Sequence, residues 1–228
     1  MTGEVGTPDR KGVWTIVVAA GSGSRFGAPK QFVDLAGVRV IDRSVAAAAP
    51  HSEGVVAVVP PNPVPNDHDP TTSDDVTMRV VTGGASRSAS VRRGLAMVPD
   101  SAEVILVHDA ARPLASAGVF QAAIAQVRKG ADAAVPVVPL TDTIRRRSGG
   151  AVDRDELVAV QTPQAFRSEL LRSAHERDAE ATDDATVVEA FGGTVVFVDG
   201  DKRNLKITTP HDFELAAAWL ARDEADSA

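Results

Sequence analysis

Residues 13–31 read VWTIVVAAGSGSRFGAPKQ, an apolar run followed at once by a glycine-rich turn and two basic residues. The stretch 13–19 is apolar nearly throughout, which predicts a strand that is buried on both faces. Glycines let backbone N–H groups approach a ligand closely, and successive N–H groups in a turn form a concavity that binds anions. Arg25 and Lys30 add the two kinds of side chain that hold phosphate. The turn therefore predicts a triphosphate-binding loop at the end of a strand.

Two common phosphate-binding loops do not fit this turn. A Walker loop ends in Gly-Lys-Ser/Thr, whereas Lys30 stands between Pro29 and Gln31. A dinucleotide-binding turn needs a small residue at the position of Phe26, because helix and strand pack closely there. We therefore expect a phosphate loop of another kind.

The composition of the 228-residue chain narrows its functional class. Apolar residues make up 43%, enough for a globular core, and the absence of cysteine excludes disulfides, thiolate metal sites and cysteine nucleophiles. The formal charge of −7 argues against a binder of nucleic acid or anionic membranes, so a local basic cluster favours a small anionic ligand. The N-terminal residues show no signal-peptide core, and no apolar run is long enough to span a bilayer. We therefore expect a cytoplasmic protein.

Short β-branched runs alternate with alanine-rich stretches along the chain. The predicted strands are 13–19, 54–59, 77–81, 104–107 and 131–137, and the predicted helices are 41–49, 88–97 and 116–129. This alternation predicts one α/β domain over residues 1–228, with a doubly wound, mostly parallel, Rossmann-like sheet. Ligands of such sheets bind beyond the carboxyl ends of the strands, so the glycine loop and residues 108–113 should meet at one edge.

Two segments interrupt the pattern. Residues 60–75 are rich in proline and aspartate, which predicts a surface loop. Residues 141–160 contain three successive arginines and a Ser-Gly-Gly turn, and they could form either a solvated loop or a projecting two-stranded β-arm. An isolated hairpin is marginal in water, so such an arm would pack on a partner subunit.

A second glycine loop and the end of the fourth predicted strand carry candidate binding residues. Residues 82–91 read TGGASRSASV and open a predicted helix, where serines could cap the helix or help to read the edge of a base. Asp109 follows His108, and an aspartate at a strand end can hold Mg²⁺, bind a sugar hydroxyl or cap the next turn. Arg112 could pair with Asp109, and His108 is expected to be a hydrogen-bonded structural residue rather than a general base.

Near the C-terminus, Lys206 lies between Leu205 and Ile207 in a predicted short strand that leads into a helix. Alternation in a strand points the lysine away from its apolar neighbours, toward either solvent or a ligand. Pro210 suits the first turn of the helix and Thr209 suits its cap.

Taken in order, these motifs resemble the 2-C-methyl-D-erythritol 4-phosphate cytidylyltransferases of the non-mevalonate isoprenoid pathway. The resemblance runs from residue 13 to about 220, and it also includes Asp142-Thr143, QTPQ at 161–164, TDDA at 182–185 and KIT at 206–208. It implies a nucleotidyltransferase fold and a reaction with Mg²⁺ as cofactor. In that reaction an oxygen of the sugar phosphate attacks the α-phosphorus of CTP in line and displaces pyrophosphate.

The resemblance also implies roles for individual residues. The catalytic residues would be Arg25, Lys30 and Lys206, which bind the triphosphate and stabilise its developing charge. The CTP-binding residues would be Ala19, Ala20, Gly21, Gly23, Gly84, Ala85 and Ser90. The substrate-binding residues would be Asp109, Arg112, Thr143, Arg154 and Thr162. Mg²⁺ in this family is held largely by phosphates, so the resemblance implies no firm protein ligand, although Asp109 could contact the ion. Family members often carry an acidic or polar residue where Ala85 stands, so only its backbone is left to contact the base.

The partners implied are CTP and a polyol phosphate, with no nucleic acid and no membrane. Arg154 would reach the site of the neighbouring subunit, so the resemblance implies a homodimer through the arm at 141–160.

The residues leave other functions open. A ribitol 5-phosphate cytidylyltransferase shares the fold and the CTP loops, and the choice of polyol rests on a few contacts around Asp109 and Thr162. A non-catalytic CTP-binding module of the same fold is an alternative of another class, although the three catalytic cations are retained. A nucleic-acid binder is supported only by the three arginines at 145–147, within an acidic chain.

Overall fold

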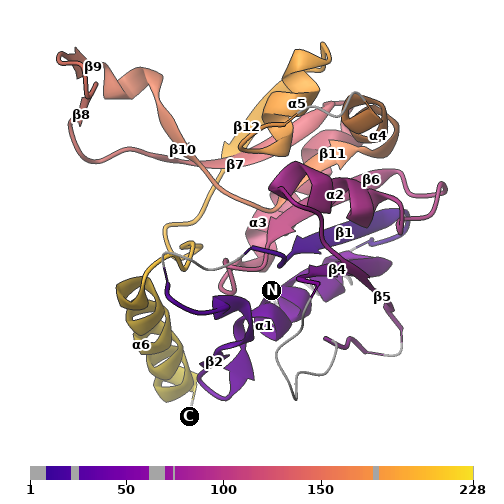
Figure 1. Ribbon diagram of the computed structural model, residues 1–228, viewed down its shortest axis with the longest axis horizontal. Coiled ribbons are helices and arrows are strands. Elements are labelled where there is room, and N and C mark those ends of the chain that lie inside the picture. Colours follow the sequence, from indigo (N-terminus) through magenta and orange to yellow (C-terminus); the bar gives the residue numbers. More distant parts are fainter. Residues whose placement is uncertain (1–8, 22–25, 62–69, 74, 177–179, 228) are drawn as a thin grey trace, which may run out of the picture.

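The structure is a computed structural model that describes residues 9–21, 26–61, 70–73, 75–176 and 180–227. Its centre is a mostly parallel sheet with the strand order β10-β7-β11-β6-β1-β4-β5, in which β12 also pairs with β7 (Figure 1). The strands are β1 (Val13–Val18), β4 (Gly54–Val59), β5 (Thr77–Thr82), β6 (Val104–Asp109), β7 (Ala133–Pro139), β10 (Val158–Val160), β11 (Gln164–Arg167) and β12 (Val195–Asp199). β10 and β11 run antiparallel to their neighbours.

Helices cover both faces of this sheet, which explains why its strands are apolar on both sides. Along β1, Val13 and Val17 pack with α1 (Val40–Ala48) and α3 (Ala117–Arg128). Trp14 and Ile16 point to the other face and pack with the helices of that side. These are α2 (Arg87–Leu95), α4 (Ser168–Glu176) and α5 (Asp184–Ala190). The result is a three-layer arrangement, as predicted for a doubly wound fold.

A smaller apolar cluster holds the C-terminal helix beside the main body. Leu35, Val40, Ile207 and Ala216 are buried together between α6 (Pro210–Ser227) and the hairpin of β2 (Asp34–Leu35) and β3 (Val38–Arg39). Pro210 opens α6, as its fixed φ favours, and the Oγ1 of Thr209 accepts a hydrogen bond from the Asp212 N–H at 3.3 Å. None of the described helices is both long and apolar enough to cross a membrane.

The predicted strands and helices are confirmed with small shifts at their ends. The short strand predicted around Lys206 is wrong: this stretch is irregular, and its alternation arises because Ile207 enters the small cluster while Lys206 points away from that cluster, toward Asp109. Two short antiparallel strands, β10 and β11, and the C-terminal elements α4, α5 and β12 were not predicted. Part of the predicted loop at 60–75 lies outside the described residues.

The segment at 141–160 contains a two-stranded ribbon. β8 (Ile144–Arg145) pairs antiparallel with β9 (Ala151–Val152) as a separate sheet, and the one-turn helix η3 (Arg154–Glu156) follows. In Figure 1 the ribbon lies apart from the central sheet, beyond β7 and β10. Its packing on a partner subunit stays a prediction.

The carboxyl ends of β1, β4, β5 and β6 bring three loops together. The Ala19 N–H donates to Val58 O at 2.8 Å, the Gly83 N–H to Val59 O at 2.7 Å and the Ala110 N–H to Val18 O at 3.1 Å. The two glycine loops also touch, since a Cβ atom at Gly83 would overlap the side chain of Ala20. The edge predicted to bind a ligand is therefore where these loops meet.

Candidate active site

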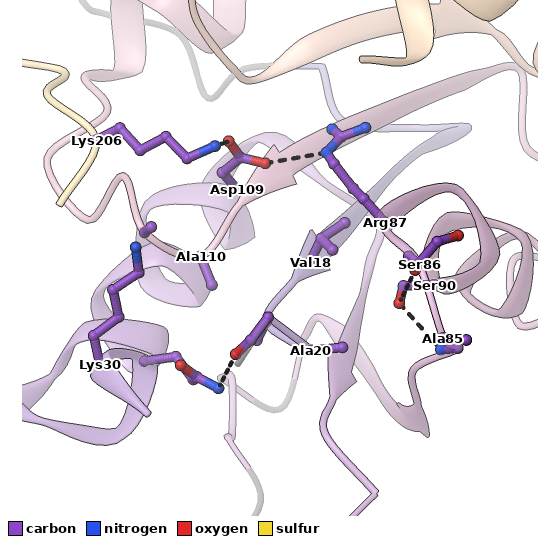
Figure 2. Close-up of a pocket in the computed structure, with 15 residues that line it drawn as sticks. Val18, Ala20, Lys30, Ala85, Ser86, Arg87, Ser90, Asp109, Ala110 and Lys206 are labelled. Carbon is purple, nitrogen blue, oxygen red and sulfur yellow. Dashed lines mark hydrogen bonds and ion pairs between the residues drawn. The ribbon is translucent and has the colours of Figure 1, made fainter. Parts of the chain in front are cut away.

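A cavity of about 440 Å³ opens at this edge of the sheet (Figure 2). It lies between the first glycine loop, the second glycine loop, the end of β6 and the loop before α6. The lining residues are Val18, Ala19, Ala20, Gly21, Lys30, Gln31, Gly84, Ala85, Ser86, Arg87, Ser90, Asp109, Ala110, Ala111 and Lys206. Side chains and backbone that are far apart in sequence thus surround one space.

The Asp109 carboxylate is held between two cations in this cavity. Lys206 Nζ lies 2.7 Å from Oδ2 and Arg87 Nε lies 3.6 Å from Oδ1. Figure 2 shows the two basic side chains reaching Asp109 from opposite sides. Burial alone would raise the pKa of Asp109, but the charges of Lys206 and Arg87 outweigh it and hold that pKa well below its usual range. Asp109 is therefore an anion and a very weak base.

The two lysines of the cavity are connected through the loop before α6. The N–H of Ile207 donates to Ala111 O at 2.8 Å and anchors this loop beside the end of β6. Lys30 Nζ donates to Ile207 O at 2.5 Å. Since Ile207 is fully buried, the neighbouring Lys206 is directed into the cavity at the same rim as Lys30. The two cations therefore converge on one cavity, and their catalytic roles stay a prediction.

Ser90 organises the backbone of the second glycine loop. Its Oγ accepts a hydrogen bond from the Gly84 N–H at 3.1 Å and donates one to Ser86 O at 2.8 Å. Ser86 in turn caps α2, because its Oγ accepts from the Ala89 N–H at 3.0 Å. At Ala85 only a methyl group and the backbone border the cavity. These hydrogen bonds therefore hold the loop in one conformation, in which its backbone groups can contact a ligand.

His108 and Thr162 form a buried chain of hydrogen bonds behind Asp109. The Asp109 N–H donates to Thr162 Oγ1 at 2.9 Å, and Thr162 Oγ1 lies 3.2 Å from His108 Nδ1. His108 Nε2 lies 3.2 Å from Arg112 O. All bonds are satisfied if the neutral imidazole accepts at Nδ1 and donates at Nε2. This is the structural role expected of His108.

Arg112 is buried, and its guanidinium also contacts backbone. Nη1 donates to Asn204 O at 2.6 Å and Nη2 donates to Val160 O at 3.2 Å. Arg112 and Thr162 thus lie beside the cavity with hydrogen bonds inside the protein, and their contact with a substrate stays a prediction.

The remaining predicted residues lie elsewhere. Thr143 and Arg154 are exposed in the segment of the two-stranded ribbon, where Arg154 Nη1 donates to Thr141 O at 2.6 Å. Arg25 and Gly23 lie outside the described residues. Sequence reasoning did not assign a site role to Arg87, although its place directly after the N-cap of α2 at the ligand edge is a usable signal.

Among the described residues, the cavity offers Mg²⁺ a single carboxylate. They contain no group of three or more acidic or histidine side chains that could hold a metal ion, and Asp109 is the one acidic side chain among those lining the cavity. Mg²⁺ is commonly bound by one or two carboxylates together with substrate phosphates. A single carboxylate beside a phosphate-binding loop therefore fits the predicted cofactor.

Comparisons with known proteins point to one family. The family model described as IspD, 2-C-methyl-D-erythritol 4-phosphate cytidylyltransferase, matches residues 13–222. Proteins of that name from Rhodococcus jostii and Nocardia farcinica are 43% and 41% identical, with 93% of this chain covered in both cases and 97% and 96% of the relatives. A bifunctional IspD/IspF enzyme from Bradyrhizobium is 44% identical over 92% of this chain, which spans only 57% of that relative.

A solved structure gives the same result. The crystal structure of 2-C-methyl-D-erythritol 4-phosphate cytidylyltransferase from Thermus thermophilus superposes with a TM-score of 0.75 at 34% identity, and covers 91% of this chain and 98% of its own.

Because His108 is buried, we expect the protein to lose stability in mild acid. Burial lowers the pKa of His108 from 6.5 to about 4. Between about pH 4 and pH 6.5 the unfolded chain therefore binds a proton that the folded protein does not bind. We expect the free energy of unfolding to fall by up to about 3 kcal/mol over this range. Urea unfolding of the parent and of His108→Gln at pH 7 and pH 5 measures it. An equal fall in both proteins would contradict the assignment.

Proposed function

Because this chain belongs to the 2-C-methyl-D-erythritol 4-phosphate cytidylyltransferase family, we propose that it joins CTP to 2-C-methyl-D-erythritol 4-phosphate and releases pyrophosphate. The observation that carries the proposal is the meeting of Lys30, Lys206 and Arg87 around one cavity between two glycine loops. Three cations facing a single space suit a highly charged ligand such as a nucleoside triphosphate.

In this proposal the triphosphate lies along the first glycine loop, where backbone N–H groups and Lys30 contact its oxygens. Lys206 and the sequence-assigned Arg25 neutralise charge at the α-phosphate as the new bond forms. Cations aimed in advance at developing charge lower a barrier by about 2–4 kcal/mol each. The backbone of Gly84 and Ala85, held by Ser90, contacts the cytosine ring.

No general base is required for this reaction. The nucleophile is a phosphate oxygen of the polyol phosphate, which is already ionised, so positioning and charge neutralisation carry the step. This agrees with the depressed pKa of Asp109, which makes the carboxylate an orienting group for the polyol rather than a proton acceptor. When Mg²⁺ is bound, Asp109 would hold it together with the phosphates, and the ion would neutralise negative charge on the triphosphate.

The homodimer, the requirement for Mg²⁺ and the cytoplasmic location are parts of the same proposal. The dimer is supported by apolar side chains exposed near the ribbon, with Val158 and Val160 each 40% exposed on β10. Arg154 is exposed in this region and does not line the described cavity, which suits a role in the site of a partner subunit.

Incubation with CTP and Mg²⁺ tests the reaction. Purified protein should release pyrophosphate with 2-C-methyl-D-erythritol 4-phosphate and form the cytidyl diphosphate product, whereas ribitol 5-phosphate should react far more slowly. A preference for ribitol 5-phosphate, or CTP binding without turnover of either polyol, would contradict the proposed function.

Removal of Lys206 should affect turnover more than nucleotide binding. We expect Lys206→Ala to lower kcat by about 100- to 1,000-fold and to weaken CTP binding by less than about fivefold. Lys202→Ala, on the exposed part of the same loop, serves as the matched control and should keep parental kinetics. Steady-state kinetics and calorimetry with CTP separate the two effects. Equal losses of turnover and affinity would instead indicate a simple binding role.

Mixed dimers test the role of Arg154. Lys206→Ala and Arg154→Ala should each be nearly inactive alone. After unfolding and refolding together in equal amounts, about a quarter of parental activity should return, because half of the random dimers contain one intact site. Activity of the mixture no greater than the mean of the two variants would show that Arg154 does not act across subunits.

A further inference from the structure

The TDDA motif at 182–185 contributes a buried carboxylate that the proposed reaction does not use. Asp184 begins α5, and its side chain is 1% exposed. A charge so removed from water is costly unless it is paired and hydrogen-bonded. Its partners therefore indicate why the chain keeps it there.

Asp184 binds one partner with each oxygen. Oδ2 accepts from Arg87 Nη1 at 2.7 Å, and Oδ1 lies 3.0 Å from Nε2 of His175, which is itself buried in α4. The carboxylate thus connects the start of α5 to α4 and to the first residue of α2. Arg87 is the member of this group that also reaches the active-site cavity.

Arg87 is shared between two carboxylates. Its Nη1 is within hydrogen-bond distance of Asp184, whereas its Nε stays 3.6 Å from Asp109. Burial alone would lower the pKa of Arg87, but Asp184 and then Asp109 raise it, so the guanidinium is always charged. Arg87 Nε thus lies beside Asp109 without a hydrogen bond to it, and Lys206 makes the short contact with Asp109 at 2.7 Å.

Neighbouring residues of the same segment contact the N-cap and the first two turns of α2. Glu180 Oε1 accepts from Ser86 Oγ at 2.9 Å and from Arg92 Nη2 at 3.1 Å. The Ala181 N–H donates to Ser88 Oγ at 3.3 Å. Glu180, Ala181 and Asp184 thus all contact the N-terminal half of α2 or its N-cap, directly after the second glycine loop.

We propose that Asp184, supported by His175, is a positioning residue that fixes the position of the Arg87 guanidinium. It thereby determines which of the two cations, Arg87 or Lys206, makes the closer contact with Asp109. Without its charge, Arg87 turns to Asp109, whose carboxylate already lies 3.6 Å from its Nε, and displaces Lys206. Asp109 and Lys206 then no longer face the polyol phosphate and the α-phosphate in the productive arrangement. The kinetic part of this inference rests on the proposed function.

The Asp184→Asn variant tests the proposal, because asparagine keeps the shape and removes the charge. We expect kcat/KM for 2-C-methyl-D-erythritol 4-phosphate to fall by about 10- to 100-fold, as displacements near 1 Å produce, with CTP affinity changed by less than about threefold. Arg87→Lys keeps a positive charge but loses the planar fork that spans two carboxylates, so it should reproduce the loss. The double variant should be little worse than either single one.

Asp132→Asn is the matched control. Asp132 also joins secondary-structure elements through an arginine and a backbone N–H, since it binds Arg167 and accepts from the Thr194 N–H at 2.9 Å, but it lies away from the cavity. It should lower the melting temperature and leave the kinetic constants unchanged. The proposal is overturned if Asp184→Asn behaves in the same way, or if the effects of Asp184→Asn and Arg87→Lys add.

A crystal structure of Asp184→Asn gives an answer that does not depend on turnover. We expect Arg87 Nε within hydrogen-bond distance of Asp109 and Lys206 released. An unchanged Arg87 overturns the inference even if the parent enzyme is active. An inactive parent refutes the proposed function and leaves the structural result to decide the inference. Should Asp184→Asn fail to fold, Arg87→Lys carries the kinetic test.

Discussion

The pairing of Asp109 with Lys206 and Arg87 is the interaction on which the rest of the site depends. A carboxylate at this depth would be strongly disfavoured alone, and two cations on opposite sides offset that cost. The same contacts determine where three elements meet, because Asp109 ends β6, Arg87 begins α2 and Lys206 precedes α6. The ion pairs that balance the charge of Asp109 therefore also fix the geometry of the candidate site.

The parallel sheet makes this meeting possible. Strands that run in the same direction end at the same edge, so loops separated by many residues in sequence become neighbours there. Small residues let those loops touch: a side chain at Gly83 would collide with Ala20. The backbone groups left between the loops are held in place by Ser90 and by the cap of α2. The resulting cavity is lined by small residues and by the cations Lys30, Arg87 and Lys206, which suits an anionic ligand.

The sequence predicted those strands and helices whose pattern of apolar residues is visible along a short stretch of chain. The strands of the sheet centre are continuous apolar runs because helices cover both faces, and this is visible in the sequence. β10 and β11 have three and four residues, too few for a periodic pattern, and they run antiparallel. The alternation around Lys206 was wrongly assigned to a strand, since an irregular loop that buries Ile207 beside α6 produces the same pattern. Arg87 was missed because its partner Asp184 lies 97 residues away.

By itself the sequence determined the class of fold, the two glycine loops, the cations Lys30 and Lys206, and the family to which they belong, because these depend on residue type and order. Only the tertiary structure decided which charged and polar side chains pair with one another. It directed Arg112 to backbone carbonyls, placed Thr162 against His108, and connected the cavity through Arg87 to the buried Asp184. The physical reason is that electrostatic pairing depends on distance and burial in space, and neither quantity is written in the order of residues along the chain.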